Sequence, residues 1–195
     1  PTAVAREVIE RIGDAQVSVP EGFQVHSKLM NLLRKRQNMS RQGGIDWGFG
    51  ELLAFGSLLM EGVPVHMTGE DVRRATFAQR HAVMHDQRNG SEWTPLDYLT
   101  PNQAKLSIVD SLLSEYGAMA FEYGYSVERS EGLNIWEGQF GDFANGAQTV
   151  IDEYVSSAEQ KWGQHSGLVL LLPHGLEGQG PDHSSARIER YLQLC

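Results

Sequence analysis

One carboxylate stands in a part of the chain that is otherwise suited to burial. Glu115 lies within Leu112 to Phe121, where most of its neighbours are apolar or small. A buried carboxylate is costly unless it is paired, hydrogen-bonded or protonated. Such a group can hydrogen-bond a ligand nitrogen and share a proton with it. The alternative is a structural acid at a helix N-terminus, stabilised by the helix dipole with Ser114 as the cap.

A second set of chemical groups lies in the stretch from Leu170 to Arg190. A strand-like run from Leu168 to Leu172 leads into a loop rich in glycine, and a helix start follows at Ser184 or Ser185. Ligands of open α/β sheets bind at the carboxyl ends of strands, so this loop is well placed to contact one. Its candidate side chains are His174, Glu177, Asp182 and His183.

Two aromatic residues lie three positions apart, just after the strand predicted at Leu133 to Trp136. Phe140 and Phe143 would share one face of a helix, with Gln139 directly before them. Such a pair usually packs in a core, but it can also form a platform for a flat heterocycle. Both interpretations stay open from the residues alone.

Metal and phosphate sites have weaker support. His174, Asp182 and His183 could in principle bind a metal, but their spacing matches no common zinc pattern and no thiol accompanies them. The glycines of Gly175 to Gly180 do not form the dinucleotide fingerprint. The basic stretch formed by Gly69–Arg74 and Thr76–Val83, with three arginines and a histidine, suits anionic ligands, an interface ion-pair network or simply a solvated charged loop.

The elements that must position these groups alternate along the chain. Short apolar runs typical of strands alternate with longer stretches whose apolar residues recur at helical spacing. This order predicts an α/β domain in which a parallel sheet is covered by helices on both faces. We expect this domain over residues 45–195, preceded by an N-terminal arm with helices over residues 1–44. The predicted strands cover 63–68, 106–109, 133–136 and 168–172, and the main helices 46–60, 112–123 and 142–161.

Composition narrows the function classes. The chain carries a net charge of −9 without a basic stripe, so nucleic acid is not an expected partner. No apolar run reaches membrane-spanning length and no signal-peptide pattern is present, so no membrane association is expected. The single cysteine, Cys195, excludes a disulfide framework within the chain and fits a reducing compartment. Because the chain starts at Pro1 and stops just after a predicted helix begins, we expect a C-terminally truncated piece of a longer protein.

Five long motifs are spread along the chain from Ile12 to Cys195. They are IGDAQVSVPEGFQVHSKL, IDWGFGELLAFGSLLMEGVPVHMTGEDVRRATFAQRHAV, LLSEYGAMAFEYGYS, WEGQFGDFANGAQTVIDEYVSSAEQKWG and LLLPHGLEGQGPDHSSARIERYLQLC. In these motifs the chain resembles the decarboxylating first component of the 2-oxoglutarate dehydrogenase complex, which depends on thiamine diphosphate. One departure is Gly138, where the family pattern leads us to expect Ala.

The resemblance implies a Rossmann-like α/β domain that binds the aminopyrimidine ring of the cofactor. In the family pattern Glu115 is the catalytic acid that hydrogen-bonds the pyrimidine ring nitrogen. Phe140 and Phe143 match the aromatic residues that contact the ring, with Phe143 as the expected stacking residue. Gln139 is a further candidate for cofactor binding.

The resemblance also implies a substrate side of the site and a reaction. His183 matches a catalytic histidine that contacts substrate or intermediate, and His174 lies nearby as a second substrate-binding candidate. The implied reaction is oxidative decarboxylation of 2-oxoglutarate, with succinyl transfer to a lipoyl group on the succinyltransferase component. The expected location is the cytoplasm of a bacterium, or the mitochondrial matrix of a eukaryote.

The family pattern includes groups that this sequence lacks. The diphosphate- and magnesium-binding domain carries a Gly-Asp-Gly motif, whereas the nearest matches here are Gly13-Asp14-Ala15 and Gly141-Asp142-Phe143. We therefore expect no metal ligands in this chain, Mg²⁺ on the missing domain, and the cofactor between that domain and the pyrimidine domain of a homodimer partner. A fragment with half of the site should be inactive alone.

Three alternatives remain open beside this interpretation. The first is a relative that acts on a longer oxoacid such as 2-oxoadipate. The second is a non-catalytic interaction domain that has kept the fold. The third and weakest is a metallohydrolase built on His174, Asp182 and His183.

Overall fold

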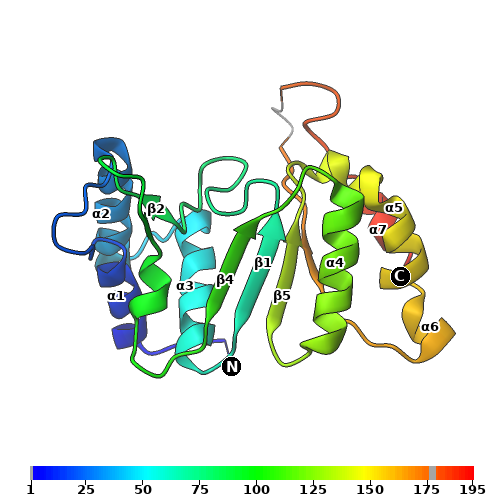
Figure 1. Ribbon diagram of the computed structural model, residues 1–195, viewed down its shortest axis with the longest axis horizontal. Coiled ribbons are helices and arrows are strands. Elements are labelled where there is room, and N and C mark those ends of the chain that lie inside the picture. Colours follow the sequence, from blue (N-terminus) through cyan, green and yellow to red (C-terminus); the bar gives the residue numbers. More distant parts are fainter. Residues whose placement is uncertain (1, 176–178) are drawn as a thin grey trace. The chain divides into compact units, whose positions relative to one another are not determined.

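The computed structural model describes residues 2–175 and 179–195 (Figure 1). The chain forms two compact units that interleave along the sequence. The first unit comprises Pro1–Pro64 and Phe77–Leu106, and the second comprises Val65–Thr76 and Ser107–Cys195. Within the described residues no helix is long and apolar enough to cross a membrane.

The first unit is mainly helical. Helices α1 (Arg6–Ala15), α2 (Ser27–Gln42) and α3 (Trp47–Met60) bury apolar residues between them. Asp46 caps α3 as predicted, because its carboxylate accepts a hydrogen bond of 2.9 Å from the backbone N–H of Phe49. The remaining elements are the antiparallel pair β2 (Met84–His85) and β3 (Glu92–Trp93) and the short 3₁₀ helix η1 (Pro95–Tyr98).

Two arginines are buried in this first unit. Arg80 is 0% exposed and forms a two-pronged ion pair with Glu51, with Nε–Oε1 and Nη2–Oε2 distances of 2.5 and 3.1 Å. Arg36 is also buried and donates to the carbonyl oxygens of Gln79 at 2.6 Å and Arg80 at 2.8 Å. Burial lowers the pKa of Arg36 to about 10. Of the three interpretations of the basic stretch, Arg80 fits ion pairing, here with Glu51 of the same unit, and this contact helps to fix the loop in which Arg80 lies.

The second unit contains the predicted parallel sheet. Its strand order is β4-β1-β5-β6, in which β1 pairs with β5 and β5 pairs with β6, both in parallel. In Figure 1 the arrow of β4 points the same way as that of β1. Helix α4 (Glu115–Glu128) packs on β1 and β5, and further helical segments follow β5. The fold class is thus confirmed. The strands are β4 (Leu106–Asp110), β1 (Val65–Gly69), β5 (Leu133–Glu137) and β6 (Val169–Leu171).

The core of the second unit lies between α4, β5 and the segments after β5. Trp136 of β5 is 0% exposed and lies in one cluster with Met119 and Tyr123 of α4. Val150 and Ile151, which belong to the apolar stripe predicted for residues 142–161, complete the cluster. Strand alternation sends Trp136 to this face of the sheet, because successive side chains of a strand point to opposite faces.

The single helix predicted for residues 142–161 is wrong. The segment is divided into a 3₁₀ helix η2 (Gly141–Ala147), a short α5 (Gln148–Val150), a π turn η3 (Ile151–Val155) and α6 (Ala158–Trp162). The cause of the wide turn is local, since the hydroxyls of Ser156 and Ser157 both donate to the carbonyl oxygen of Asp152. Gly163 ends α6 in the left-handed conformation, as predicted.

Two further expectations need correction. Helix α4 begins at Glu115 rather than at Leu112, because the Ser114 hydroxyl caps it by accepting from the backbone N–H of Gly117 at 3.1 Å. Strand β6, expected to be buried, has only β5 as a neighbour among the described strands, and its residue Val169 is 37% exposed. An edge position explains this, since an edge strand is covered along one side only.

Candidate functional site

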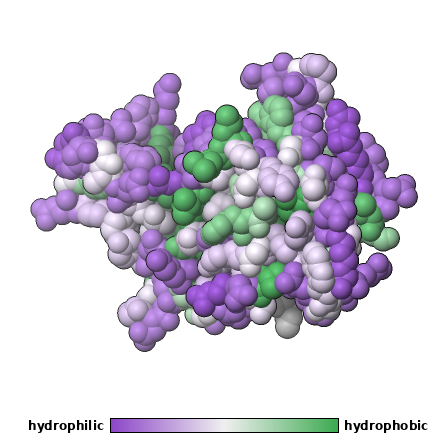
Figure 2. All heavy atoms as spheres, turned by 45° about the vertical axis from the view of Figure 1, so that its right-hand side comes forward, coloured by the Kyte–Doolittle hydropathy of each residue, from purple (hydrophilic) through white to green (hydrophobic). Residues whose placement is uncertain are grey.

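A pocket of about 630 Å³ opens in the second unit where its strands end. Glu70 follows β1 and Gln139 lies just beyond β5, and both line the pocket. Glu115, the first residue of α4, lines it as well. Hydrophobic side chains are exposed on the face that carries α4 (Figure 2). The pocket therefore lies at the carboxyl end of a parallel sheet, where such folds bind their ligands.

Among the described residues that line the pocket, Glu115 is the only carboxylate with an oxygen atom that is buried without a hydrogen-bond partner. Its Oε1 atom accepts a long hydrogen bond of 3.4 Å from the backbone N–H of Gln139, while Oε2 is buried without a partner. The pKa of Glu115 is raised to about 7, mainly by burial; the Gln139 N–H opposes this shift and the negative charge of Glu70 adds to it. Near neutral pH this carboxyl can therefore both donate and accept a proton.

The two interpretations of Glu115 are compatible. Ser114 caps α4, so the carboxyl does lie at a helix N-terminus as the structural interpretation expected. Stabilisation by the helix dipole would lower a carboxyl pKa, however, whereas here burial dominates and raises it. A perturbed carboxyl in a pocket wall is a candidate functional group.

The predicted aromatic pair lies in the same pocket and includes a third ring. The ring centroids of Phe140 and Phe143 are 6.0 Å apart in an edge-to-face arrangement. His183 lies edge to face with both rings, at 4.7 Å from Phe140 and 5.1 Å from Phe143. All three residues line the pocket and are partly exposed, which favours the ring-platform interpretation over core packing.

His183 is oriented by its neighbour. Its Nδ1 atom lies 2.8 Å from Oδ1 of Asp182, and this hydrogen bond lowers the pKa of Asp182. When the carboxylate accepts, the proton of the imidazole is on Nδ1, and Nε2 remains as the nitrogen with a free lone pair. His183 can therefore offer an acceptor to a molecule in the pocket.

His174 does not line the pocket. Its Nδ1 accepts a hydrogen bond of 2.9 Å from the backbone N–H of Ala186, and the N–H of Ser185 donates to Asp142 at 3.3 Å. These contacts fix the segment that carries His183. The structure thus gives His174 a supporting contact, and its substrate role stays a prediction. Glu177 lies outside the described residues.

Gly141 allows the same segment to approach closely. A Cβ atom at this position would lie 2.5 Å from the Cβ of Ala186 and 3.2 Å from that of Leu172. Only glycine leaves room for this contact. At Gly138, where the family pattern leads us to expect Ala, an added Cβ would lie 2.9 Å from the carbonyl oxygen of Phe140, so the backbone there would have to shift.

Several pocket residues escaped the sequence reasoning. Glu70 was considered only as part of the basic stretch, although it lies two residues after the strand predicted over 63–68, whose end lies beside that of β5. Leu113 and Tyr116 flank Glu115 and could have been found from its neighbourhood alone. The other missed lining residues are Ser114, Asn145 and Gly146.

The metallohydrolase alternative finds no geometric support. Across residues 2–175 and 179–195, no group of three His, Cys, Asp or Glu side chains is arranged to hold a metal ion. His174 is engaged with Ala186, and Asp182 with His183, so the two histidines act in different contacts.

Comparison with known families agrees with this geometry. Residues 43–195 match the family described as transketolase, pyrimidine binding domain, and the chain belongs to that family. The pyrimidine-binding domain that the resemblance implied is thereby confirmed. The boundary predicted at residue 45 concerns the same region and stays a prediction.

Among curated proteins, the chain is similar to much longer bacterial enzymes. It is 54% identical over 199 aligned residues to the "Multifunctional 2-oxoglutarate metabolism enzyme" of Mycobacterium sp. strain JLS. Proteins of the same name from Mycobacterium sp. strain KMS and Mycolicibacterium vanbaalenii are also 54% identical. Each match covers 99% of this chain but 16% of the relative, so the chain spans about a sixth of their length.

Proposed function

We propose that the chain supplies the aminopyrimidine half of a thiamine diphosphate site in a succinyl-transferring 2-oxoglutarate dehydrogenase. The observation that carries the proposal is the buried, unpartnered Oε2 of Glu115 in a pocket wall, on a carboxyl whose pKa is about 7. The name of the mycobacterial relatives supports 2-oxoglutarate as the substrate.

The residues of the pocket fit one end of this cofactor. Glu115 offers a carboxyl oxygen to a ring nitrogen, and the backbone N–H of Gln139 holds the other oxygen of the same carboxyl. Phe140 and Phe143 offer ring faces and edges to a flat heterocycle, with Phe143 as the proposed stacking residue. When bound, thiamine diphosphate supplies a nucleophilic carbon that adds to the oxoacid carbonyl and accepts the electrons released with carbon dioxide.

The contribution of Glu115 is proton transfer at one atom. A carboxyl with a pKa close to 7 is present in both protonation states at working pH, so it can give a proton to a ring nitrogen and take it back. A heterocycle stacked on Phe140 and Phe143 would itself shield that contact from water and strengthen it. On the substrate side, Nε2 of His183 is the proposed contact for the oxoacid, and Asp182 keeps the imidazole in the required orientation.

The other half of the site would come from elsewhere. The sequence holds no Gly-Asp-Gly motif, so the diphosphate and Mg²⁺ are proposed to bind to a different domain, provided by a homodimer partner. Transfer of the succinyl group to a lipoyl-bearing succinyltransferase component is part of the same proposal. A 2-oxoadipate-type activity is the enzymatic alternative, and the full-length protein can be assayed with both oxoacids.

Replacement of Glu115 in the full-length protein tests the proposal. Glu115→Ala should lower cofactor-dependent decarboxylation of 2-oxoglutarate by about 10²- to 10⁴-fold, the usual contribution of a positioned acid–base group. Glu115→Gln is the matched variant that keeps a hydrogen-bonding side chain without the transferable proton. Activity unchanged in both variants would contradict the proposal and favour the non-catalytic interaction domain.

The isolated 195 residues provide a second test. With thiamine diphosphate and Mg²⁺ added, they should show no measurable turnover of 2-oxoglutarate, because half of the site is absent. Turnover above the level of a Glu115→Ala control would overturn the half-site part of the proposal.

A further inference from the structure

A second carboxylate of α4 is completely buried and does not line the pocket. The side chain of Glu122 is 0% exposed and lies in the middle of the helix, away from the stabilising N-terminal dipole. Burial of a carboxylate is strongly unfavourable unless its oxygens find good partners. A specific set of partners must therefore hold Glu122 where it is.

The partners come from strand β1. The Thr68 hydroxyl donates to Oε1 of Glu122 at 2.8 Å, and Nε2 of His66 lies 3.0 Å from the same oxygen. His66 and Thr68 are two positions apart, so both point from β1 to the face on which α4 lies. Two side chains of one strand thus converge on one oxygen of the helix.

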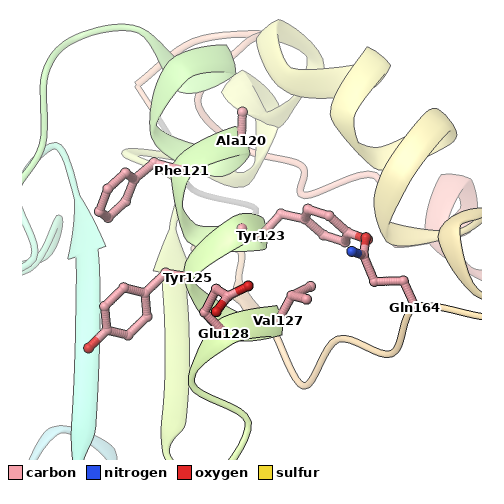
Figure 3. A pocket seen from close by; sticks show the side chains of 8 residues that line it. Ala120, Phe121, Tyr123, Tyr125, Val127, Glu128 and Gln164 are labelled. Atoms are coloured by element: carbon pink, nitrogen blue, oxygen red, sulfur yellow. The ribbon is translucent and has the colours of Figure 1, made fainter.

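An aromatic contact strengthens this junction between α4 and β1. The rings of His66 and Tyr125 are stacked with their centroids 4.0 Å apart. Figure 3 shows that Tyr125 leaves α4 on the same side as Phe121, whereas Tyr123 points to the other side towards Gln164. The helix is therefore held on β1 by a hydrogen-bonded acid and by a stacked ring three residues further on.

The junction is incomplete as a source of stability. Oε2 of Glu122 and Nδ1 of His66 are both buried, and neither has a hydrogen-bond partner in the part of the chain that the structure describes. Buried polar networks that are only partly satisfied stabilise less than a well-packed apolar contact. What directional hydrogen bonds do provide is a fixed position, because they weaken steeply when their geometry changes.

By fixing the position of α4, the Glu122 hydrogen bonds also fix the position of Glu115. Glu115 and Glu122 are seven residues apart, so they lie on the same face of α4, about 10 Å apart along its axis. The end of α4 around Glu115 has little packing of its own, since Leu113 is 79% and Tyr116 51% exposed. Between the two acids, Met119 is the only buried side chain of α4, and its apolar contacts are non-directional.

The strand side of the junction leads to the pocket too. Thr68 is two residues before Glu70, which lines the pocket and whose charge raises the pKa of Glu115. The hydrogen bond between Thr68 and Glu122 therefore couples the strand that delivers Glu70 to the helix that delivers Glu115. A slip of α4 along β1 would change the Glu70–Glu115 separation and the 3.4 Å contact between Glu115 and Gln139.

We propose that Glu122, held by Thr68 and His66, is a positioning residue that sets the place of Glu115 against the cofactor ring. This inference rests on the proposed function of Glu115. It assigns no direct contact with cofactor or substrate to Glu122.

The test uses the full-length protein and the variant Glu122→Met, which keeps the length of the side chain but removes the hydrogen bonds. The dissociation constant of thiamine diphosphate, measured by tryptophan fluorescence with Mg²⁺ present, should rise by about tenfold to about a hundredfold. The pH dependence of cofactor binding should also move, because the surroundings of Glu115 change. Glu122→Gln keeps an acceptor oxygen for Thr68 and should restore most of the affinity.

A matched control separates positioning from stability. Met119→Leu alters the neighbouring buried side chain of α4 without removing a hydrogen bond, so it should change the melting temperature but neither the affinity nor its pH dependence. If Glu122→Met lowers only the melting temperature, Glu122 is merely structural and the inference is overturned. Should Glu122→Met fail to fold, Thr68→Val is the alternative, because it removes one hydrogen-bond donor at nearly constant shape. Cofactor affinity and pH dependence like those of the wild type in Thr68→Val would also overturn the inference.

The outcomes also separate this inference from the proposed function. If a Glu115 variant binds thiamine diphosphate as tightly as the wild-type protein does, the proposed function itself is contradicted. Affinity that depends on Glu115 but not on Glu122 would contradict the positioning role alone.

Discussion

Two regions of the chain take a charged side chain out of water, and they do so in opposite ways. In the first unit, Arg80 is fully buried and meets Glu51 through two short contacts. In the second unit, Glu115 is partly buried, has one long hydrogen bond, and leaves an oxygen without a partner. The charge of Arg80 is thus neutralised within the protein, whereas Glu115 remains ready for a ligand.

The difference shows how a structural charge can be told from a functional one. Burial alone does not separate them, since Arg80 is the more buried residue. What separates them is whether every polar atom has a partner within the protein. A two-pronged ion pair leaves no role for a ligand, whereas an unpaired oxygen in a pocket wall is available to bind one. This contrast predicts different responses of the two regions to substitution.

The largest effect on the free energy of unfolding is expected at the ion pair between Arg80 and Glu51. Arg80→Met leaves the Glu51 carboxylate without its partner and should lower the free energy of unfolding by about 3–5 kcal/mol. Arg74→Ala is the control, because it removes an exposed ion pair with Asp71 and should cost less than about 1 kcal/mol. Denaturant unfolding measures both. A loss below about 1 kcal/mol for Arg80→Met would remove the contrast.

Replacement of the functional carboxylate, Glu115, should increase stability near neutral pH, whereas replacement of Arg80 should decrease it. Since the pKa of Glu115 is raised from 4.5 to about 7, the folded chain holds the proton more tightly than the unfolded chain. The resulting stability is fully present below about pH 4.5 and is lost as the pH rises through about 7. Glu115→Gln does not ionise, so it should match wild type at pH 4 and be more stable at pH 8. A stability difference that is independent of pH would show that the carboxyl is not perturbed.

The aromatic platform should give a smaller effect on binding. In the full-length protein, Phe143→Ala should weaken thiamine diphosphate binding by about tenfold, since loss of an aromatic stack costs up to roughly 1.5 kcal/mol. Phe140→Ala, which removes the neighbouring ring but not the proposed stack, should have less effect. Calorimetric titration can compare the two variants, and an equal or reversed order would exclude Phe143 as the stacking residue.

The smallest effect is expected at Gly138. An Ala there would place its Cβ 2.9 Å from the backbone carbonyl oxygen of Phe140, so the backbone must shift, which should cost about 1 kcal/mol. Thermal unfolding of Gly138→Ala measures this, with Gly124→Ala as a control in open space. A Gly138→Ala protein more stable than wild type would show that the local backbone relaxes without strain.

The sequence was most informative where local chemistry decides the structure. Asp46 was predicted to cap α3 and does so, and Glu115, Gln139, Phe140, Phe143 and His183 were predicted as site residues and do line one pocket. The strand order β4-β1-β5-β6 was not predictable, and it is this order that brings Glu70 beside Glu115. The Glu122 junction depends on the same non-local pairing.

Other misses have local physical causes. The apolar stripe over residues 142–161 correctly predicted the buried face, but periodicity does not report hydroxyls that compete for a backbone carbonyl, as Ser156 does for Asp152. The role of Arg80 stayed open because composition cannot show that Glu51, 29 residues away in the sequence, lies opposite it.

The π turn at Ile151–Val155 has a consequence for the tolerance of the chain to deletions. A π turn holds one residue more than the α-helical path that it replaces. Removal of one residue between Asp152 and Ser156 would therefore let the backbone return to ordinary helical geometry, with the rest of the helix kept in its present direction. This turn is therefore a place in the second unit where the chain can become shorter by one residue while the packing of Val150 and Ile151 with Trp136 is kept.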